Sequence, residues 1–185
     1  MRLIHAEDKH LSALNHALDL KNSYGNGVTA MFLIYNATGD TLEQLEDQKV
    51  DWLGNVSTEE PPASIQNGQW ITFIHAHPTA QAVGSEAARV FRGHDITGQV
   101  RDYMVAWFVR WDSIPNSAYP EVREKDHFPK FWGYIVSLLE RAGKVTKDQT
   151  DEYCASTVSI GGYTSSEVIA VLQHKFSPLP DQDIL

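Results

Sequence analysis

The chain has 185 residues, of which 42% are apolar and 21% are charged, a balance close to that of soluble globular proteins. This composition excludes a fibrous or wholly disordered chain and suffices for one hydrophobic core. The net charge is −9, so the chain lacks the excess of basic residues that nucleic acid requires, and we expect no nucleic-acid partner.

Cysteine content and the N-terminal residues bear on the cellular compartment. Cys154 is the only cysteine, so an intramolecular disulfide framework and a CxxC metal knuckle are excluded. The first 20 residues lack the uninterrupted apolar core of a secretory signal. No apolar run approaches the roughly 18 residues of a membrane helix. We therefore expect a cytoplasmic protein with no membrane partner.

The N-terminal third predicts a helix followed by a buried strand. Leucines at positions 11, 14 and 18 recur at helical spacing, which predicts a helix over residues 8–21 within an N-terminal helical extension, 1–24. The run 28–36, "VTAMFLIYN", is apolar, β-branched and aromatic, as in a strand buried on both faces.

The next strands are separated by turns. "ATGD" at 37–40 predicts a turn from which 41–45 returns as a strand. Residues 50–54, "VDWLG", predict a short strand, and the prolines at 61 and 62 exclude a central strand there. Residues 69–77, "QWITFIHAH", alternate with a period of two and predict a central strand.

Two long strands follow, over 86–92 and 102–111, joined by a glycine-containing loop. Alternate residues of the second strand share one face, which is typical of a sandwich core; they are Tyr103, Val105, Trp107, Val109 and Trp111.

The C-terminal part predicts a loop, a helix and a hairpin. Residues 113–120 contain two prolines and predict a loop, and the spacing of Phe131, Ile135, Leu138 and Ala142 predicts a helix over 126–143. Residues 154–176 predict a hairpin that turns at Gly161-Gly162.

Strands outnumber helices and follow one another without βαβ alternation. We therefore expect a mainly β protein, an antiparallel β-sandwich with an N-terminal and a C-terminal helix packed at its ends. A single domain would span 1–185, with its core strands in 28–111.

Five segments resemble, in their order, the landmarks of the plant 23 kDa jasmonate-induced protein family. They are "FLIYNATGDTL", "DWLG", "IQNGQWITFIHAHPT", "GSEAARVFRG" and "YMVAWFVRW". The resemblance covers residues 28–111, and "STVSIGGYTSS" follows it more loosely. It implies a cytosolic plant protein associated with stress, wounding or defence hormones, and it transfers no catalytic residue.

His75 and His77 are two residues apart on a strand, so their side chains point the same way, with Cα atoms about 6–7 Å apart. They could bind zinc or copper if His94, Asp95 or His174 supplied a third ligand. The simpler interpretation is that His75 bonds to the backbone or a buried carboxylate, and that His77 ends the strand before Pro78.

Tryptophans beside polar loops suggest a small-molecule or glycan ligand, because their rings offer a flat apolar surface with a polar edge. Trp52 and Trp70 are the candidate walls of such a pocket, and Asn36 and Asp40 the candidate hydrogen-bonding groups.

Two other classes of function stay open. Cys154 or Ser85, with a histidine as base, could act as a nucleophile, although neither lies in a GxSxG motif. A non-catalytic interaction protein is the third class, and the terminal helices could mediate a homodimer. The sequence does not decide whether the protein is an enzyme.

Overall fold

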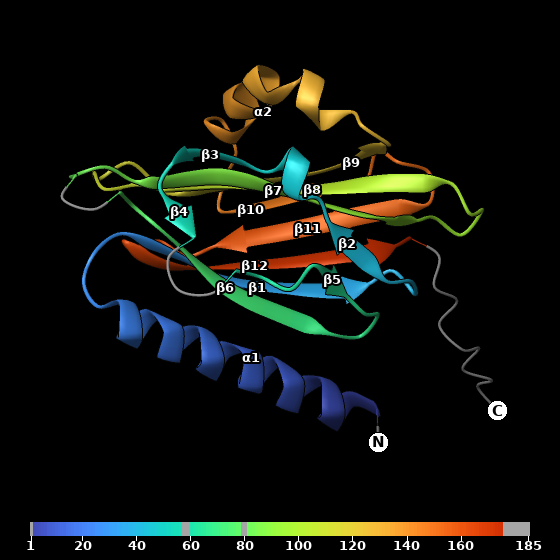
Figure 1. The fold of residues 1–185 in the computed structure, drawn as a ribbon, viewed down its shortest axis with the longest axis horizontal. Coiled ribbons are helices and arrows are strands. Elements are labelled where there is room, and N and C mark those ends of the chain that lie inside the picture. Colours follow the sequence, from blue (N-terminus) through green and yellow to red (C-terminus); the bar gives the residue numbers. More distant parts are fainter. Residues whose placement is uncertain (1, 57–59, 79–80, 176–185) are drawn as a thin grey trace.

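Two β-sheets pack face to face, and one helix covers the outer face of each (Figure 1). The computed structural model describes residues 2–56, 60–78 and 81–175. Helix α1 (Arg2–Tyr24) packs on the first sheet, and α2 (Trp132–Leu139) packs on the second. The expected β-sandwich with two helices is confirmed, with the helices lying across the sheet faces where we had expected them at the ends.

The first sheet has the strand order β10-β11-β12-β1-β6-β4. Its strands are β1 (Thr29–Ala37), β4 (Asn55–Val56), β6 (Trp70–Ala76), β10 (Val145–Asp148), β11 (Cys154–Ile160) and β12 (Ser165–His174). All neighbours are antiparallel except β1 and β12, which run parallel with Phe32 opposite Val168. This parallel pair departs from the fully antiparallel sheets that we expected.

The second sheet has the order β5-β2-β7-β8-β9, and β3 pairs with the other half of β7. Its strands are β2 (Leu42–Gln44), β3 (Val50–Leu53), β5 (Ser64–Ile65), β7 (Ser85–His94), β8 (Val100–Val109) and β9 (Ser117–Glu124). Short 3-10 helices, η1 (Glu46–Gln48) and η2 (Phe128–Lys130), precede β3 and α2.

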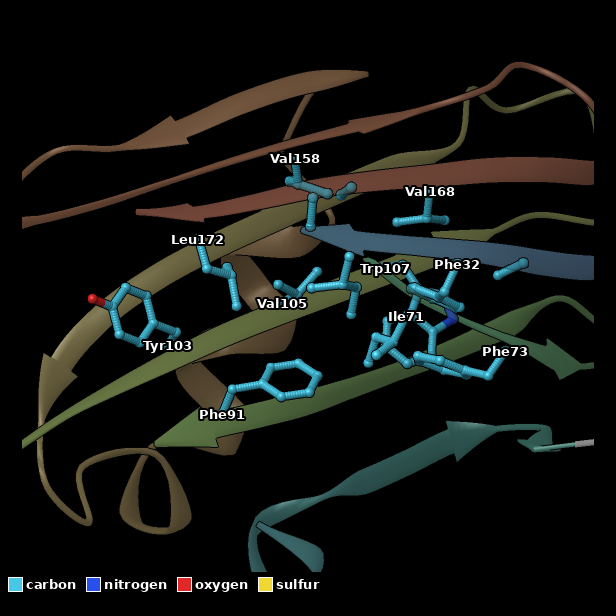
Figure 2. Close-up of a cluster of buried hydrophobic side chains, with 14 of the residues drawn as sticks. Phe32, Ile71, Phe73, Phe91, Tyr103, Val105, Trp107, Val158, Val168 and Leu172 are labelled. Atoms are coloured by element: carbon cyan, nitrogen blue, oxygen red, sulfur yellow. The ribbon is translucent and has the colours of Figure 1, made fainter. Parts of the chain in front are cut away.

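The main core lies between the two sheets (Figure 2). Phe32 of β1 stacks on Phe73 of β6 with ring centroids 4.3 Å apart, and Trp107 from β8 packs edge-on against Phe32 with centroids 4.2 Å apart. Burying each such ring stabilises the fold by roughly 1.5–3 kcal/mol. Met31 and Leu33 point to the opposite face of β1, beneath α1, which explains why this strand is apolar on both faces.

Two predicted elements are corrected. Residues 41–45 were expected to return beside 28–36, but β2 pairs with β5 and β7 in the second sheet. The predicted loop 113–120 contains the start of β9, which continues to Glu124. Pro120 fits there because β9 is an edge strand, so its missing N–H interrupts no ladder on the open side.

The C-terminal elements also differ in detail. The helix predicted over 126–143 is confined to residues 132–139, and Phe131, expected on its buried stripe, is exposed. The hairpin of β11 and β12 is as predicted, although residue 176 lies outside the described residues. Both strands bury side chains in the main core, which therefore extends beyond 28–111. None of the helices described is long and apolar enough to cross a membrane.

Candidate functional site

Large apolar side chains are exposed on two loops at one end of the sandwich. Trp111 and Ile114, in the loop from β8 to β9, are 53% and 54% exposed, and Tyr163, in the turn from β11 to β12, is 81% exposed. We call this surface the aromatic end. Exposing such side chains to water is unfavourable, so a cluster of them marks a contact surface.

Asn116 holds the two loops of the aromatic end together. Its buried side-chain NH2 group lies 2.9 Å from three acceptors, the carbonyl oxygens of Gly161 and Tyr163 and Oγ of Ser166, which share its two N–H donors. Its side-chain oxygen accepts a bond of 2.8 Å from the backbone N–H of Arg110. One asparagine therefore positions Trp111 and Tyr163 on a common surface.

A cavity of about 630 Å³ opens beside Trp111. It is lined by the C-terminal part of α1, the loop that follows it and the start of β12; the residues are Lys21, Asn22, Gly25, Asn26, Gly27, Trp111, Thr164 and Ser165. The chain turns tightly here because Gly25 and Gly27 adopt φ values of +91° and +129°.

The cavity combines one cationic group with hydroxyls and an indole ring. The ammonium group of Lys21 donates to the carbonyl oxygen of Gly25, and burial lowers the pKa of Lys21. The ring of Trp111 lies 6.4 Å from that of His77. Such a site can accept a phosphate or another polar group while Trp111 enters an apolar layer.

Sequence reasoning missed this site. Trp111 was assigned to the buried face of β8, but the strand ends at Val109, two residues earlier. The signals that could have revealed it are the flanking Asp112 and Pro115, which are typical of a loop. Nothing local in the sequence reveals that this loop meets the turn at Tyr163.

The four predicted ligand-binding residues do not form one site. The side chain of Asn36 is buried and donates to the carbonyl oxygens of Asp40 and Ile65, both at 2.8 Å, so it stabilises a turn. The carboxylate of Asp40 bonds to His94 at 2.9 Å. Trp52 packs edge-on against Trp132 beneath α2, with centroids 6.1 Å apart.

Trp70 does line a cavity, of about 510 Å³, between α1 and β6. The polar side chains around it include those of Ser12, His16, Ser64 and Gln69. The indole is half-buried, with the rings of His10 and Tyr35 each 4.9 Å away. Of the four predicted residues, Trp70 alone has the surroundings expected of a pocket wall.

The three histidines predicted as metal ligands lie apart. Both ring nitrogens of His75 are bonded, Nδ1 to Oγ of Ser85 at 2.7 Å and Nε2 to the carboxylate of Asp51 at 3.1 Å. Ser85 and His94 are the two ends of β7, roughly 30 Å apart at about 3.3 Å per residue. Among the side chains that the structure describes, in residues 9–56, 60–78 and 81–175, no three His, Cys, Asp or Glu are grouped to hold a metal ion.

His77 has separate contacts as well. Its Nδ1 lies 2.9 Å from the carbonyl oxygen of Gln81, and its Nε2 packs against Gly27. The grouping of His75, His77 and His94 is therefore wrong, and the simpler interpretation holds for His75, which bonds a carboxylate.

Asp51, His75 and Ser85 form a hydrogen-bonded chain that resembles a Ser-His-Asp triad. A nucleophile must reach its substrate, but Ser85 is buried beside the ring of Trp107. Cys154 is also buried, its Sγ 3.0 Å from the hydroxyl of Tyr103, and burial raises the pKa of its thiol to about 11. Neither side chain has the surroundings of an activated nucleophile.

Comparisons with known proteins agree with the resemblance found in the sequence. The chain is 33% identical over 179 residues to the 23 kDa jasmonate-induced protein of Hordeum vulgare, covering 95% of this chain and 84% of that one. Its fold is similar to the crystal structure of lipid binding protein Nakanori, with a TM-score of 0.78 and 27% identity over 87% of this chain and 78% of the other.

A Xerocomus chrysenteron lectin shares the fold alone, with a TM-score of 0.53 and 12% identity over 78% of this chain and 98% of the lectin. A family model described as Nakanori-like protein matches residues 1–175. The chain therefore belongs to the Nakanori-like protein family.

Proposed function

We propose that the protein binds a membrane lipid through its aromatic end. The observation that carries this proposal is the exposure of Trp111, Ile114 and Tyr163 on two loops that Asn116 ties together beside a cavity. Aromatic side chains favour the boundary between lipid headgroups and acyl chains, where one side is apolar and the other wet. Similarity to a lipid-binding protein supports the same class of ligand.

The charges of the chain favour a lipid without net charge. The net charge of −9 repels an anionic membrane surface, whereas Lys21 places one ammonium group in the cavity beside Trp111. A zwitterionic headgroup presents a phosphate to Lys21 without the long-range repulsion. The proposal revises our expectation that the protein has no membrane partner.

The proposal also includes the biological setting. The identity with a jasmonate-induced protein supports a role in plant stress or defence, in the cytoplasm as expected from the sequence. A lipid ligand would make this role one of membrane recognition.

Vesicle flotation tests the lipid proposal. Purified protein is mixed with phosphatidylcholine vesicles and, separately, with vesicles that also contain phosphatidylserine. We expect binding to the first and weaker binding to the second. Trp111→Ala should lower the partition coefficient about tenfold, because it removes roughly 1.5 kcal/mol or more of apolar burial.

Tyr134→Ala is the matched control, since Tyr134 is an exposed aromatic residue on α2, away from the aromatic end. It should bind vesicles as the wild type does. Equal losses in Trp111→Ala and Tyr134→Ala, or no flotation of the wild type, would refute the proposal.

A glycan is the second candidate ligand, favoured by the cavity at Trp70. Sugars stack on indole rings and bond to amide and hydroxyl groups such as those of Gln69 and Ser64. Calorimetric titration with monosaccharides, with Trp70→Ala as the comparison, tests it: binding that the substitution abolishes supports a glycan site, and absence of heat with every sugar rejects it.

A further inference from the structure

A cavity of about 310 Å³ lies between β9 and the start of α2. It is lined by Glu121, Arg123, His127, Phe131 and Tyr134, and we call it the α2 cavity. It shares no residue with the aromatic end or with the cavity at Trp70. The inference drawn from it goes beyond the proposed lipid binding.

The floor of the α2 cavity is a buried carboxylate. Glu121 is 1% exposed, although an ionised carboxylate is costly to bury without full compensation. Arg123 contacts its Oε1 atom and Tyr119 lies close enough to lower the pKa of the carboxyl, but Oε2 accepts no hydrogen bond of good geometry within the described residues. Burial raises the pKa of Glu121, and the charge of Arg123 opposes this.

The guanidinium of Arg123 is shared between two acids. It contacts Glu121 and also lies 3.5 Å from the carboxylate of Asp148, which is 6% exposed. His127, the other basic side chain of the cavity, lies 3.2 Å from the carboxylate of Glu124. One guanidinium thus faces two buried carboxylates, which leaves an excess of negative charge around the floor.

Aromatic rings form the outer wall. His127 stacks on Phe131 with ring centroids 4.4 Å apart, and Phe131 and Tyr134 are 43% and 49% exposed. The faces of phenylalanine and tyrosine rings attract cations through their quadrupoles. A buried carboxylate beneath aromatic faces is a combination suited to a small organic cation.

We propose that the α2 cavity binds the primary ammonium group of a small ligand, with Glu121 as hydrogen-bond acceptor and Phe131 and Tyr134 as aromatic walls. A primary ammonium suits the cavity better than a quaternary one, because only the primary group carries N–H donors for Oε2. The alkyl part of the ligand lies against the two rings.

Titration of the full chain with n-butylammonium chloride, followed by amide chemical shifts at constant ionic strength, tests this inference. We expect saturable shifts on β9 and residues 127–134, weaker binding of tetramethylammonium, and no saturable shifts with n-butanol, which is uncharged. Equal binding of the two cations, or no shift with n-butylammonium, would overturn it.

Two substitutions identify the contacts. Glu121→Gln keeps the shape of the side chain and removes its charge, and it should weaken n-butylammonium binding about tenfold or more. Glu43→Gln, at an exposed acid on β2 that touches no residue of the α2 cavity, should change it less than twofold once ionic strength is held constant.

Phe131→Leu provides a test that does not depend on the buried acid. It keeps an apolar wall without a π face at a partly exposed position, so the fold should persist and n-butylammonium should bind several-fold more weakly. Undiminished binding in both Glu121→Gln and Phe131→Leu, with native circular dichroism spectra, would refute the site.

Discussion

Oγ of Ser85 lies 2.7 Å from Nδ1 of His75, and this hydrogen bond joins the two sheets inside the sandwich. His75 belongs to β6 of the first sheet and Ser85 to β7 of the second. The neutral imidazole that donates from Nε2 to Asp51 leaves Nδ1 free to accept the hydroxyl proton. Because Ser85 and His75 are both buried and only Asp51, at the far end of the chain, reaches the solvent, the chain of bonds acts in stability.

His75→Ala should therefore destabilise the protein strongly. It removes both bonds and leaves space beside Trp107, whose ring lies 5.2 Å from the imidazole. We expect the free energy of unfolding to fall by about 2–4 kcal/mol in urea denaturation at neutral pH. His94→Ala, which removes the exposed pair with Asp40, should cost at most about 1 kcal/mol. Similar losses in the two variants would contradict a structural role for His75.

Stability should also fall as the solution becomes acidic. Burial lowers the pKa of His75 below its ordinary value of 6.5, although the bond to Asp51 opposes this shift. The unfolded chain then binds a proton more readily than the folded protein, so the contribution of His75 is complete above pH 6.5 and is lost as the pH falls below it.

Asp51 adds a second step at lower pH. Burial raises its pKa, but the bond to His75 and the charge of Arg89 outweigh burial and hold the value at about 2. Its contribution is present above the ordinary value of 3.8 and is lost as the pH falls toward 2. Unfolding free energies measured across this range for the wild type and His75→Gln test the assignment: the substitution should flatten the step that begins at pH 6.5, and an unchanged slope there would count against it.

Strand periodicity predicted the elements that form the core, because alternation along a strand depends on nearby residues alone. Phe32, Phe73 and Trp107 were all placed in strands, and all three meet between the sheets. Strand pairing was harder to predict, since the sequence does not state that β12 returns beside β1 or that β2 joins the second sheet.

The residues of the two proposed sites were predicted least well, for two physical reasons. Trp111 has the same spacing as the core residues of β8, so periodicity cannot tell that the strand ends before it. Glu121 lies in the edge strand β9, whose first residues were predicted to belong to a loop because of Pro120. Trp70 was found because it stands at the start of a clear strand beside a turn.

Gly27 is required by its neighbours. Its φ of +129° disfavours other residues, and a Cβ atom there would lie 2.3 Å from Nε2 of His77. Gly27→Ala should lower stability by roughly 1–3 kcal/mol. Gly133→Ala on α2, where a Cβ meets nothing within 4 Å, should instead raise stability by up to about 1 kcal/mol. Thermal unfolding of both variants measures these changes in stability. A Gly27→Ala variant as stable as the wild type would show that His77 moves aside.

Asn116 should control the aromatic end without taking part in ligand contact. Asn116→Ala deletes the NH2 group whose hydrogen bonds tie the loop of Trp111 to the turn of Tyr163, while both aromatic side chains remain. We expect a loss of about 1–3 kcal/mol in unfolding free energy and faster amide exchange in residues 110–116 and 161–166.

Vesicle flotation of Asn116→Ala tests whether lipid binding depends on how well the two loops are ordered, because the aromatic side chains of the loops are unchanged in this variant. A loosened loop must be ordered again on binding, so flotation should weaken in Asn116→Ala even though Trp111 and Tyr163 are intact. Asn67→Ala is the matched control, because Asn67 accepts a bond of 2.9 Å from the backbone of Gly39 in turns at the opposite end of β1. Its binding should equal that of the wild type. If Asn116→Ala floated like the wild type while its loops exchanged faster, the pairing of the two loops would be irrelevant to lipid binding.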